Sequence, residues 1–131
     1  MFLTKECDYA MRIVRALSDF ERKSVHSICE SEHIPVHFAY KILKKLECTQ
    51  VVSSTRGAFG GYKLSKALEE ISLFDIASAA NENLLINECL KAGHVCLNNT
   101  ENKRCKVHTE LASIQDELVR MLGAKTMDEL V

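Results

Sequence analysis

Residues 35–64, PVHFAYKILKKLECTQVVSSTRGAFGGYKL, decide the fold of this 131-residue chain. The first part of the stretch predicts a helix, because Ala39, Ile42, Leu43 and Leu46 recur at the spacing of one buried helical face. The second part predicts a β-hairpin, because two short β-prone runs flank the glycine-rich tip RGAFGG at residues 56–61. A helix-turn-helix followed directly by such a hairpin is typical of a winged helix.

The opposite face of the predicted helix is polar, basic and partly aromatic, which favours a recognition helix in a DNA major groove over a plain solvated face. We expect its lysines to contact phosphates and its histidine and tyrosine to contact base edges. These residues are Lys41, Lys44, Lys45, His37 and Tyr40. In the predicted wing, Arg56, Gly57 and Lys63 are the candidate contacts to a minor groove or to phosphates.

Helical periodicity predicts the elements on either side of this stretch. Two helices precede it, over 4–17 with Thr4 as N-cap and over about 25–30, and Pro35 is expected at the first position of the third helix. A further helix begins at the capping pair Ser72 and Asp75, and a loop over 82–104 follows it. A heptad seam then predicts a long helix ending before Gly123, with a capped turn over 126–129; the seam consists of Val107, Leu111, Ile114, Leu118 and Met121.

These elements predict a mainly α fold: a winged helix-turn-helix with a small β-hairpin wing and a long C-terminal dimerisation helix. We divide the chain into a DNA-binding domain (1–80), a loop (81–104) and a dimerisation helix with its C-terminal turn (105–131). Residues 1–66 carry eleven basic and seven acidic residues, whereas the remainder carries six and eleven. A polyanion such as DNA is therefore expected to bind the first half.

Six cysteines and the absence of a signal peptide or transmembrane stretch favour a cytoplasmic protein with reduced thiols and no membrane association. Three of them, Cys7, Cys29 and Cys48, lie singly on predicted helices and are expected to be small buried hydrophobic residues. The others form the pattern Cys89-x6-Cys96-x8-Cys105-x2-His108 in and beside the polar loop. Thiolates and imidazole suit zinc or an iron–sulfur cluster, and this loose spacing favours the cluster. His108 is a candidate fourth ligand or a surface histidine beside the seam.

The chain resembles the Rrf2 family of bacterial winged-helix regulators nearly from end to end. The resemblance is carried by Leu3-Thr4 with Asp8-Tyr9-Ala10, by Arg56-Gly57 with Gly60-Gly61-Tyr62, by the three loop cysteines and by Thr126-x-x-Glu129-Leu130-Val131. It implies a homodimer with crossed C-terminal helices, a palindromic site on double-stranded DNA and an iron–sulfur cluster near the dimer interface. By position, the cluster ligands fall on Cys89, Cys96 and Cys105, although the intervals between them are longer than the commoner ones.

The resemblance leaves the fourth cluster ligand open. One branch of the family holds a 2Fe-2S cluster with a histidine that corresponds to His108, and another holds a 4Fe-4S cluster with a carboxylate that corresponds to Asp8 of the partner subunit. Some relatives use a histidine from the turn before the recognition helix, which corresponds to His33. The wing arginine typical of the family corresponds to Arg56, whereas Tyr40 stands where one branch has an acidic residue.

The expected function is a transcription regulator, in particular a repressor, whose cluster senses cluster status, nitric oxide or redox state. The alternative from another class is a cluster-free thiol redox switch or a zinc-stabilised interaction protein. An enzyme is not expected, because the sequence shows no nucleophile–base pair and Gly57–Gly61 lacks the Lys-Ser/Thr ending of a phosphate-binding loop.

Overall fold

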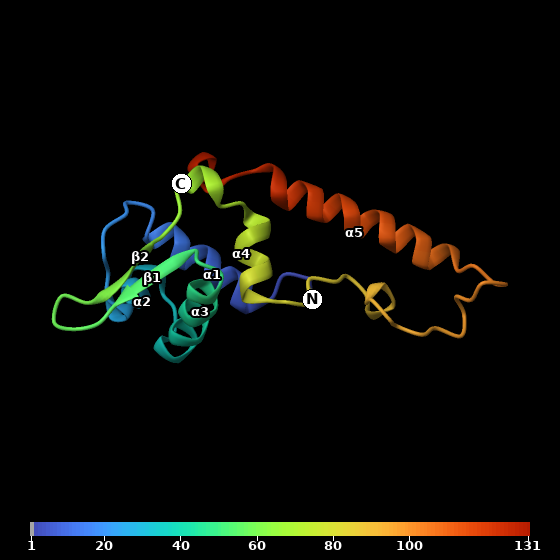
Figure 1. The fold of residues 1–131 in the computed structure, drawn as a ribbon, viewed down its shortest axis with the longest axis horizontal. Helices are drawn as coiled ribbons and strands as arrows, with labels where there is room; N and C mark the ends of the chain where they lie inside the picture. Colours follow the sequence, from blue (N-terminus) through green and yellow to red (C-terminus); the bar gives the residue numbers. More distant parts are fainter. Residues whose placement is uncertain (1) are drawn as a thin grey trace.

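The computed structural model describes residues 2–131, which form five α-helices and one two-stranded hairpin that projects at one end of the molecule (Figure 1). Helices α1 (Lys5–Ala16), α2 (Val25–Glu32) and α3 (Val36–Cys48) are followed by strands β1 (Val52–Thr55) and β2 (Gly61–Leu64). Helix α4 (Leu73–Ala80) comes next, and α5 (Lys106–Ala124) extends away from the other elements. This order confirms the predicted mainly α winged helix-turn-helix with a long C-terminal helix.

One hydrophobic core joins α1, α2, α3, α4 and the hairpin. Ile13 and Val14 on α1 and its C-cap residue Leu17 are fully buried, and so are the apolar residues of α3 that were predicted to face inward. Burial of each such aliphatic side chain contributes about 1.5–3 kcal/mol relative to its exposure. The core therefore fixes the orientation of α3, whose other face stays in solvent.

The helix ends follow local capping chemistry. Thr4 Oγ1 accepts a hydrogen bond from the Cys7 amide, as predicted for the N-cap of α1. Helix α2 runs two residues beyond the predicted end and stops at His33, which adopts a left-handed conformation with φ 56°. Pro35 is the N-cap of α3 instead of its first residue, because its ψ of 132° is extended.

The hairpin has an antiparallel register that pairs Val52 with Leu64 and Thr55 with Gly61. The tip-side half of β2 also pairs with the α1–α2 connection, because the amide of Lys23 donates to the Tyr62 carbonyl at 2.9 Å and the amide of Tyr62 donates back to the Lys23 carbonyl at 2.8 Å. The wing is thus held by a third segment of chain, which the sequence pattern did not predict.

Helix α5 continues through Gly123, where we expected it to end. Apart from its chain neighbours and the backbone of α5 itself, no atom of residues 2–131 lies within 4 Å of the position that a Cβ would occupy at Gly123, and the helix ends one residue later. The chain then returns to the hydrophobic core: Met127 is buried there and its amide donates to the Ile71 carbonyl at 2.8 Å. The C-terminal turn is therefore packed against the segment that precedes α4.

The single helical cysteines do not all behave as predicted. Cys7 and Cys29 are buried, and burial raises the pKa of the Cys29 thiol above its ordinary value. Cys48 is exposed, so the prediction of a buried hydrophobic residue is wrong there. It is the last residue of α3, where the helix has already passed the core and the chain turns into solvent at Thr49.

Candidate nucleic-acid interface and metal centre

The solvent face of α3 carries the predicted recognition side chains. His37, Tyr40 and Lys44 are exposed, whereas Ala39 and Leu43 on the opposite face are fully buried. A tyrosine that leaves half of its surface in water without a packing role supplies both an aromatic edge and a hydroxyl to a ligand. The arrangement supports hydrogen bonds and apolar contacts to base edges in a groove.

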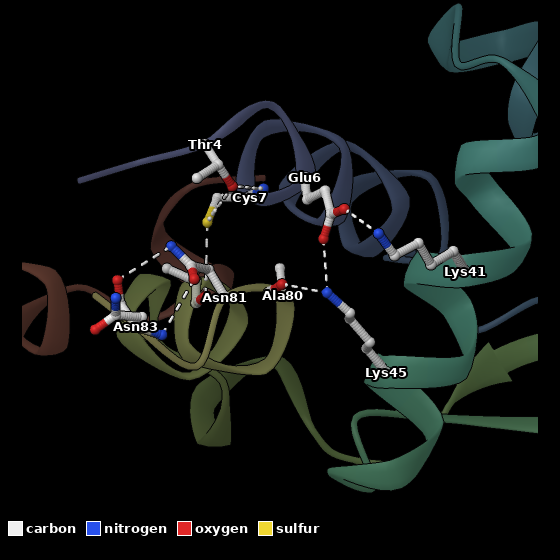
Figure 2. A network of polar contacts seen from close by, with 9 residues as sticks. Thr4, Glu6, Cys7, Lys41, Lys45, Ala80, Asn81 and Asn83 are labelled. Carbon is white, nitrogen blue, oxygen red and sulfur yellow. Dashed lines mark hydrogen bonds and ion pairs between the residues drawn. The ribbon is translucent and has the colours of Figure 1, made fainter. Parts of the chain in front are cut away.

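Two of the predicted phosphate contacts are paired inside the protein. Figure 2 shows Lys41 and Lys45 converging from α3 on the Glu6 carboxylate of α1, each at 2.6 Å. Lys45 also donates to the Ala80 carbonyl oxygen at the end of α4, at 2.9 Å. These hydrogen bonds, from Lys41 first and then from Lys45, hold the pKa of the Glu6 carboxyl below its ordinary value. Lys41 and Lys44 are both exposed, but among the described residues Lys44 forms no salt bridge, so its ammonium is the most accessible of the three to a phosphate.

The tip of the wing is a tight turn. The amide of Gly60 donates to the Gly57 carbonyl at 2.9 Å. Gly57 has a φ of 107°, a backbone conformation that residues other than glycine rarely adopt. A Cβ at Gly60 would clash with the carbonyl oxygen of Thr55. Arg56 is exposed beside this turn and Lys63 is half-buried on β2. The wing therefore presents Arg56 at its end on a backbone that glycine makes possible.

The cysteine loop, residues 81–105, carries the predicted cluster ligands. Cys89 lies in a 3₁₀ turn (Glu88–Leu90), Cys96 lies further along the loop and Cys105 is the N-cap of α5. All three are half-buried free thiols. Within residues 2–131, the structure brings no group of three or more histidine, cysteine or acidic side chains to metal-binding positions. The ligands are therefore not assembled in the single chain.

Three hydrogen bonds hold the ends of the cysteine loop. The side chain of Gln115 on α5 donates to the Leu84 carbonyl at 2.7 Å and accepts from the Ile86 amide at 3.0 Å. Asn99 Oδ1 accepts from the Cys105 amide at 3.1 Å. The middle of the loop around His94, Val95 and Leu97 is exposed to solvent. Its start and end are thus attached to α5, while its middle has few packing contacts to resist rearrangement.

His108 and Asp8, the two candidate fourth ligands, differ in their surroundings. The amide of His108 donates to Cys105 Sγ at 3.4 Å, and its Nδ1 is buried without a hydrogen-bond partner in the part of the chain that the structure describes. The Asp8 carboxylate instead pairs with Arg12 at 3.1 Å and with Lys5 at 3.3 Å on its own helix. His33 is exposed at the end of α2.

The donor set fits an iron–sulfur cluster by its chemistry. Thiolates with one imidazole are established ligands of such clusters, and a buried Nδ1 without a partner is a nitrogen whose lone pair or proton is unsatisfied. Cys89, Cys96, Cys105 and His108 are the residues that would hold the group.

The family follows from a comparison with protein-family models. The model for Rrf2, described as an iron-dependent transcriptional regulator, matches residues 3–131. The chain belongs to the Rrf2 family. It is therefore a transcriptional regulator of a DNA-binding family and not an enzyme.

Individual Rrf2 relatives match over the whole chain. The HTH-type transcriptional regulator NsrR of Geobacillus kaustophilus is 28% identical over 135 residues, which cover 100% of this chain and 90% of the relative. Among solved structures, CymR, the global cysteine regulator of B. subtilis, superposes with a TM-score of 0.75 at 21% identity and covers 98% of this chain and 94% of its own. IscR of T. potens gives a TM-score of 0.74 at 18% identity, with 98% and 84% covered.

Sequence reasoning on this Rrf2 protein missed two polar residues that position the candidate site. Glu6 binds the recognition-helix lysines from α1, and Gln115 binds the start of the cysteine loop from α5. Their partners are 39 and 31 residues away in sequence. Neither residue belongs to a local motif, so no signal within the chain pointed to these contacts.

No helix within residues 2–131 has the length and apolar character needed to cross a bilayer.

Proposed function

We propose that this Rrf2 protein is a homodimeric repressor whose affinity for a palindromic operator is controlled by an iron–sulfur cluster bound through Cys89, Cys96, Cys105 and His108. The observation that carries the choice of His108 is its buried Nδ1, which has no partner among residues 2–131. Asp8 is the weaker candidate, because its carboxylate already pairs with Arg12 and Lys5. With a histidine as fourth ligand, the resemblance favours the 2Fe-2S type.

When bound, the cluster would supply a redox- and nitric-oxide-sensitive centre whose loss releases four side chains. The protein supplies the connection to DNA. The cysteine loop joins α4, which packs against α3, to α5. A change in the loop therefore acts on the elements that set the spacing of two recognition helices. Because half-sites recur about 34 Å apart, a small change of that spacing weakens binding.

The homodimer is supported by an apolar stripe on α5. Val107, Ile114 and Met121 are exposed and Leu111 and Leu118 are half-buried, so the whole seam lacks the burial that a heptad pattern normally provides. Exposed apolar residues at heptad spacing are typical of a helix that packs against a second copy. Two crossed α5 helices would bury the stripe and hold two wings and two α3 helices in one particle.

The cluster proposal is tested with anaerobically purified protein. We expect a brown sample with visible absorption, stoichiometric iron and acid-labile sulfide. Cys89→Ser, Cys96→Ser, Cys105→Ser and His108→Ala should each lose or shift this spectrum. Cys48→Ser is the matched control, because its thiol is exposed at the end of α3 and is not one of the proposed ligands. Asp8→Asn should leave the spectrum unchanged, and loss of the cluster in Asp8→Asn with retention in His108→Ala would contradict the choice of ligand.

A second candidate, a thiol redox switch or zinc-stabilised regulator without a cluster, is favoured by one observation. Within the described residues, the loop thiols are free and are not gathered at one metal position. A colourless protein with stoichiometric zinc, or one whose DNA affinity changes only with disulfide formation, would support this candidate. In either case the wild-type dimer should select a palindromic duplex from a random pool, which tests DNA binding separately from the cofactor.

A further inference from the structure

The tip of the wing exposes a large apolar side chain that the candidate interface does not explain. Phe59 leaves 93% of its surface in solvent, the largest exposed fraction among the large hydrophobic residues of 2–131. Transfer of a phenyl ring from water to an apolar environment is favourable, and the folded monomer does not make this gain at Phe59. The ring therefore contributes nothing to the folded monomer and is available to a partner.

The turn that carries Phe59 is fixed by its backbone. Gly57 and Gly60 close the turn with a hydrogen bond of 2.9 Å, and the close approach of Gly60 to the Thr55 carbonyl leaves no room for a side chain. Close to this turn, strand β2 is held by the backbone hydrogen bonds between Tyr62 and Lys23. A side chain presented on such a turn loses little backbone entropy when it binds.

The charge of the chain segment that contains Phe59 favours one class of partner. Residues 48–68 contain no Asp or Glu but include Arg56, Lys63 and Lys66. An apolar residue within a cationic segment fits a polyanion with apolar walls. DNA has this character in its minor groove, where deoxyribose rings line the walls between the phosphates.

The position of the wing separates Phe59 from the other exposed apolar surface. Figure 1 shows the hairpin tip at the end of the molecule opposite to the start of α5, on the side where α3 lies. The seam on α5, which we assign to a second copy of the chain, therefore does not extend to Phe59. Arg56, the predicted minor-groove contact, belongs to the same wing tip as Phe59, residues 56–61.

We infer that Phe59 is a DNA contact that packs its ring against the walls of the minor groove next to Arg56. The inference rests on the proposed DNA-binding function and adds an apolar, salt-independent component to it. Apolar side chains of this kind are found between or against base steps in minor-groove complexes. Arg56 would supply the electrostatic part of the same contact.

The test measures the dissociation constant of wild type, Phe59→Ala, Phe59→Leu and Arg56→Ala for a duplex selected by the wild type, over a range of salt concentrations. Phe59→Ala should weaken binding about tenfold or more without changing the salt dependence. Arg56→Ala should lower the slope of log K against log salt by about one. Phe59→Leu, which keeps an apolar side chain, should recover most of the affinity.

Two controls separate binding from folding. The midpoint of thermal unfolding of Phe59→Ala should equal that of the wild type, because the ring is almost fully exposed. Val131→Ala, another exposed apolar residue at the chain end, should bind DNA as the wild type does. Hydroxyl-radical footprinting, which reports access to deoxyribose in the minor groove, should show lost protection at the site flanks in Phe59→Ala.

The inference is overturned if Phe59→Ala binds like the wild type, or if it changes the salt slope as Arg56→Ala does. Failure of the wild-type protein to bind or select any duplex would instead overturn the proposed function, and the inference with it. The two failures are therefore distinguished by the wild-type measurement alone.

Discussion

Lys45 lies between two elements of the protein: its Nζ is 2.6 Å from Glu6 Oε2 on α1 and 2.9 Å from the carbonyl oxygen of Ala80 at the end of α4. The recognition helix is thereby attached to the residue after which the cysteine loop begins. Lys45 was predicted to contact a DNA phosphate. Because its ammonium group is bonded to Glu6, it can do so only if the phosphate displaces the Glu6 carboxylate.

The Glu6 ion pairs predict a specific dependence of stability on pH. The pKa of the Glu6 carboxyl is lowered in the folded state, so its contribution is complete above the unfolded value of about 4.3 and is lost as pH falls through the folded value. Glu6→Gln should lower the free energy of unfolding by about 0.5–1 kcal/mol near neutral pH, and the difference from wild type should shrink in acid. Urea unfolding of both proteins, from neutral pH down to acid pH, measures this difference in the free energy of unfolding. Glu21→Gln, at an exposed turn residue, is the control, and equal effects of the two substitutions would contradict the prediction.

Two glycines should respond in opposite ways to the same substitution. Gly60→Ala places a methyl group against the Thr55 carbonyl oxygen and should cost roughly 1–3 kcal/mol or distort the wing. Gly123→Ala adds a methyl group to open space inside α5 and should stabilise the protein by roughly 0.5–1 kcal/mol. Thermal unfolding of both variants checks this, and a stabilised Gly60→Ala would show that the tip of the wing is not built as described.

The start of α4 depends on one hydroxyl group. Ser72 Oγ accepts from the Asp75 amide at 3.1 Å, and the Asp75 carboxylate accepts from the Ser72 amide at 2.8 Å. Ser72→Ala removes this N-cap and should lower the free energy of unfolding by about 1 kcal/mol. Ser78→Ala in the same helix is the matched control, because its hydroxyl only donates to the Asp75 carbonyl and its loss should be nearly neutral. Denaturant unfolding measures both variants, and an equal loss in their free energies of unfolding would show that the Ser72 N-cap does not stabilise α4.

The seam on α5 predicts the oligomeric state. Ile114 leaves 44% of its surface exposed in the single chain, so Ile114→Asp should disturb the monomer little but place a charge inside the dimer interface. We expect the dimer dissociation constant to rise at least about tenfold by sedimentation equilibrium. Ser113→Asp puts the same charge on a neighbouring exposed position outside the seam and should leave the dimer intact. A dimer that tolerates Ile114→Asp would place the interface elsewhere.

Hydrophobic periodicity and the turn-forming residues of the sequence predicted most of the fold. The buried face of α3, the capping residue Thr4, the capping pair of α4 and the glycine-rich hairpin are all set by residues at most a few positions apart, and each agrees with the structure. Element ends were less well determined. Helix α2 continued to Glu32 and α5 passed Gly123, because a helix end depends on what packs beside it as well as on the residue that can stop it.

For the candidate site, too, the sequence predicts one part and the tertiary structure decides the rest. The residue types that bind DNA or a cluster are visible in the chain, because a basic helical face and a group of thiols with an imidazole have recognisable chemistry at recognisable spacing. The sequence does not show whether each side chain is paired, buried or exposed, since this depends on partners from distant elements. Several of these side-chain states exist only once the helices pack: the pairing of Lys41 and Lys45 with Glu6, the salt bridges of Asp8, the unsatisfied Nδ1 of His108, and the exposure of Phe59 and Cys48. They distinguish the candidate ligands and the accessible DNA contacts from other residues of the same type.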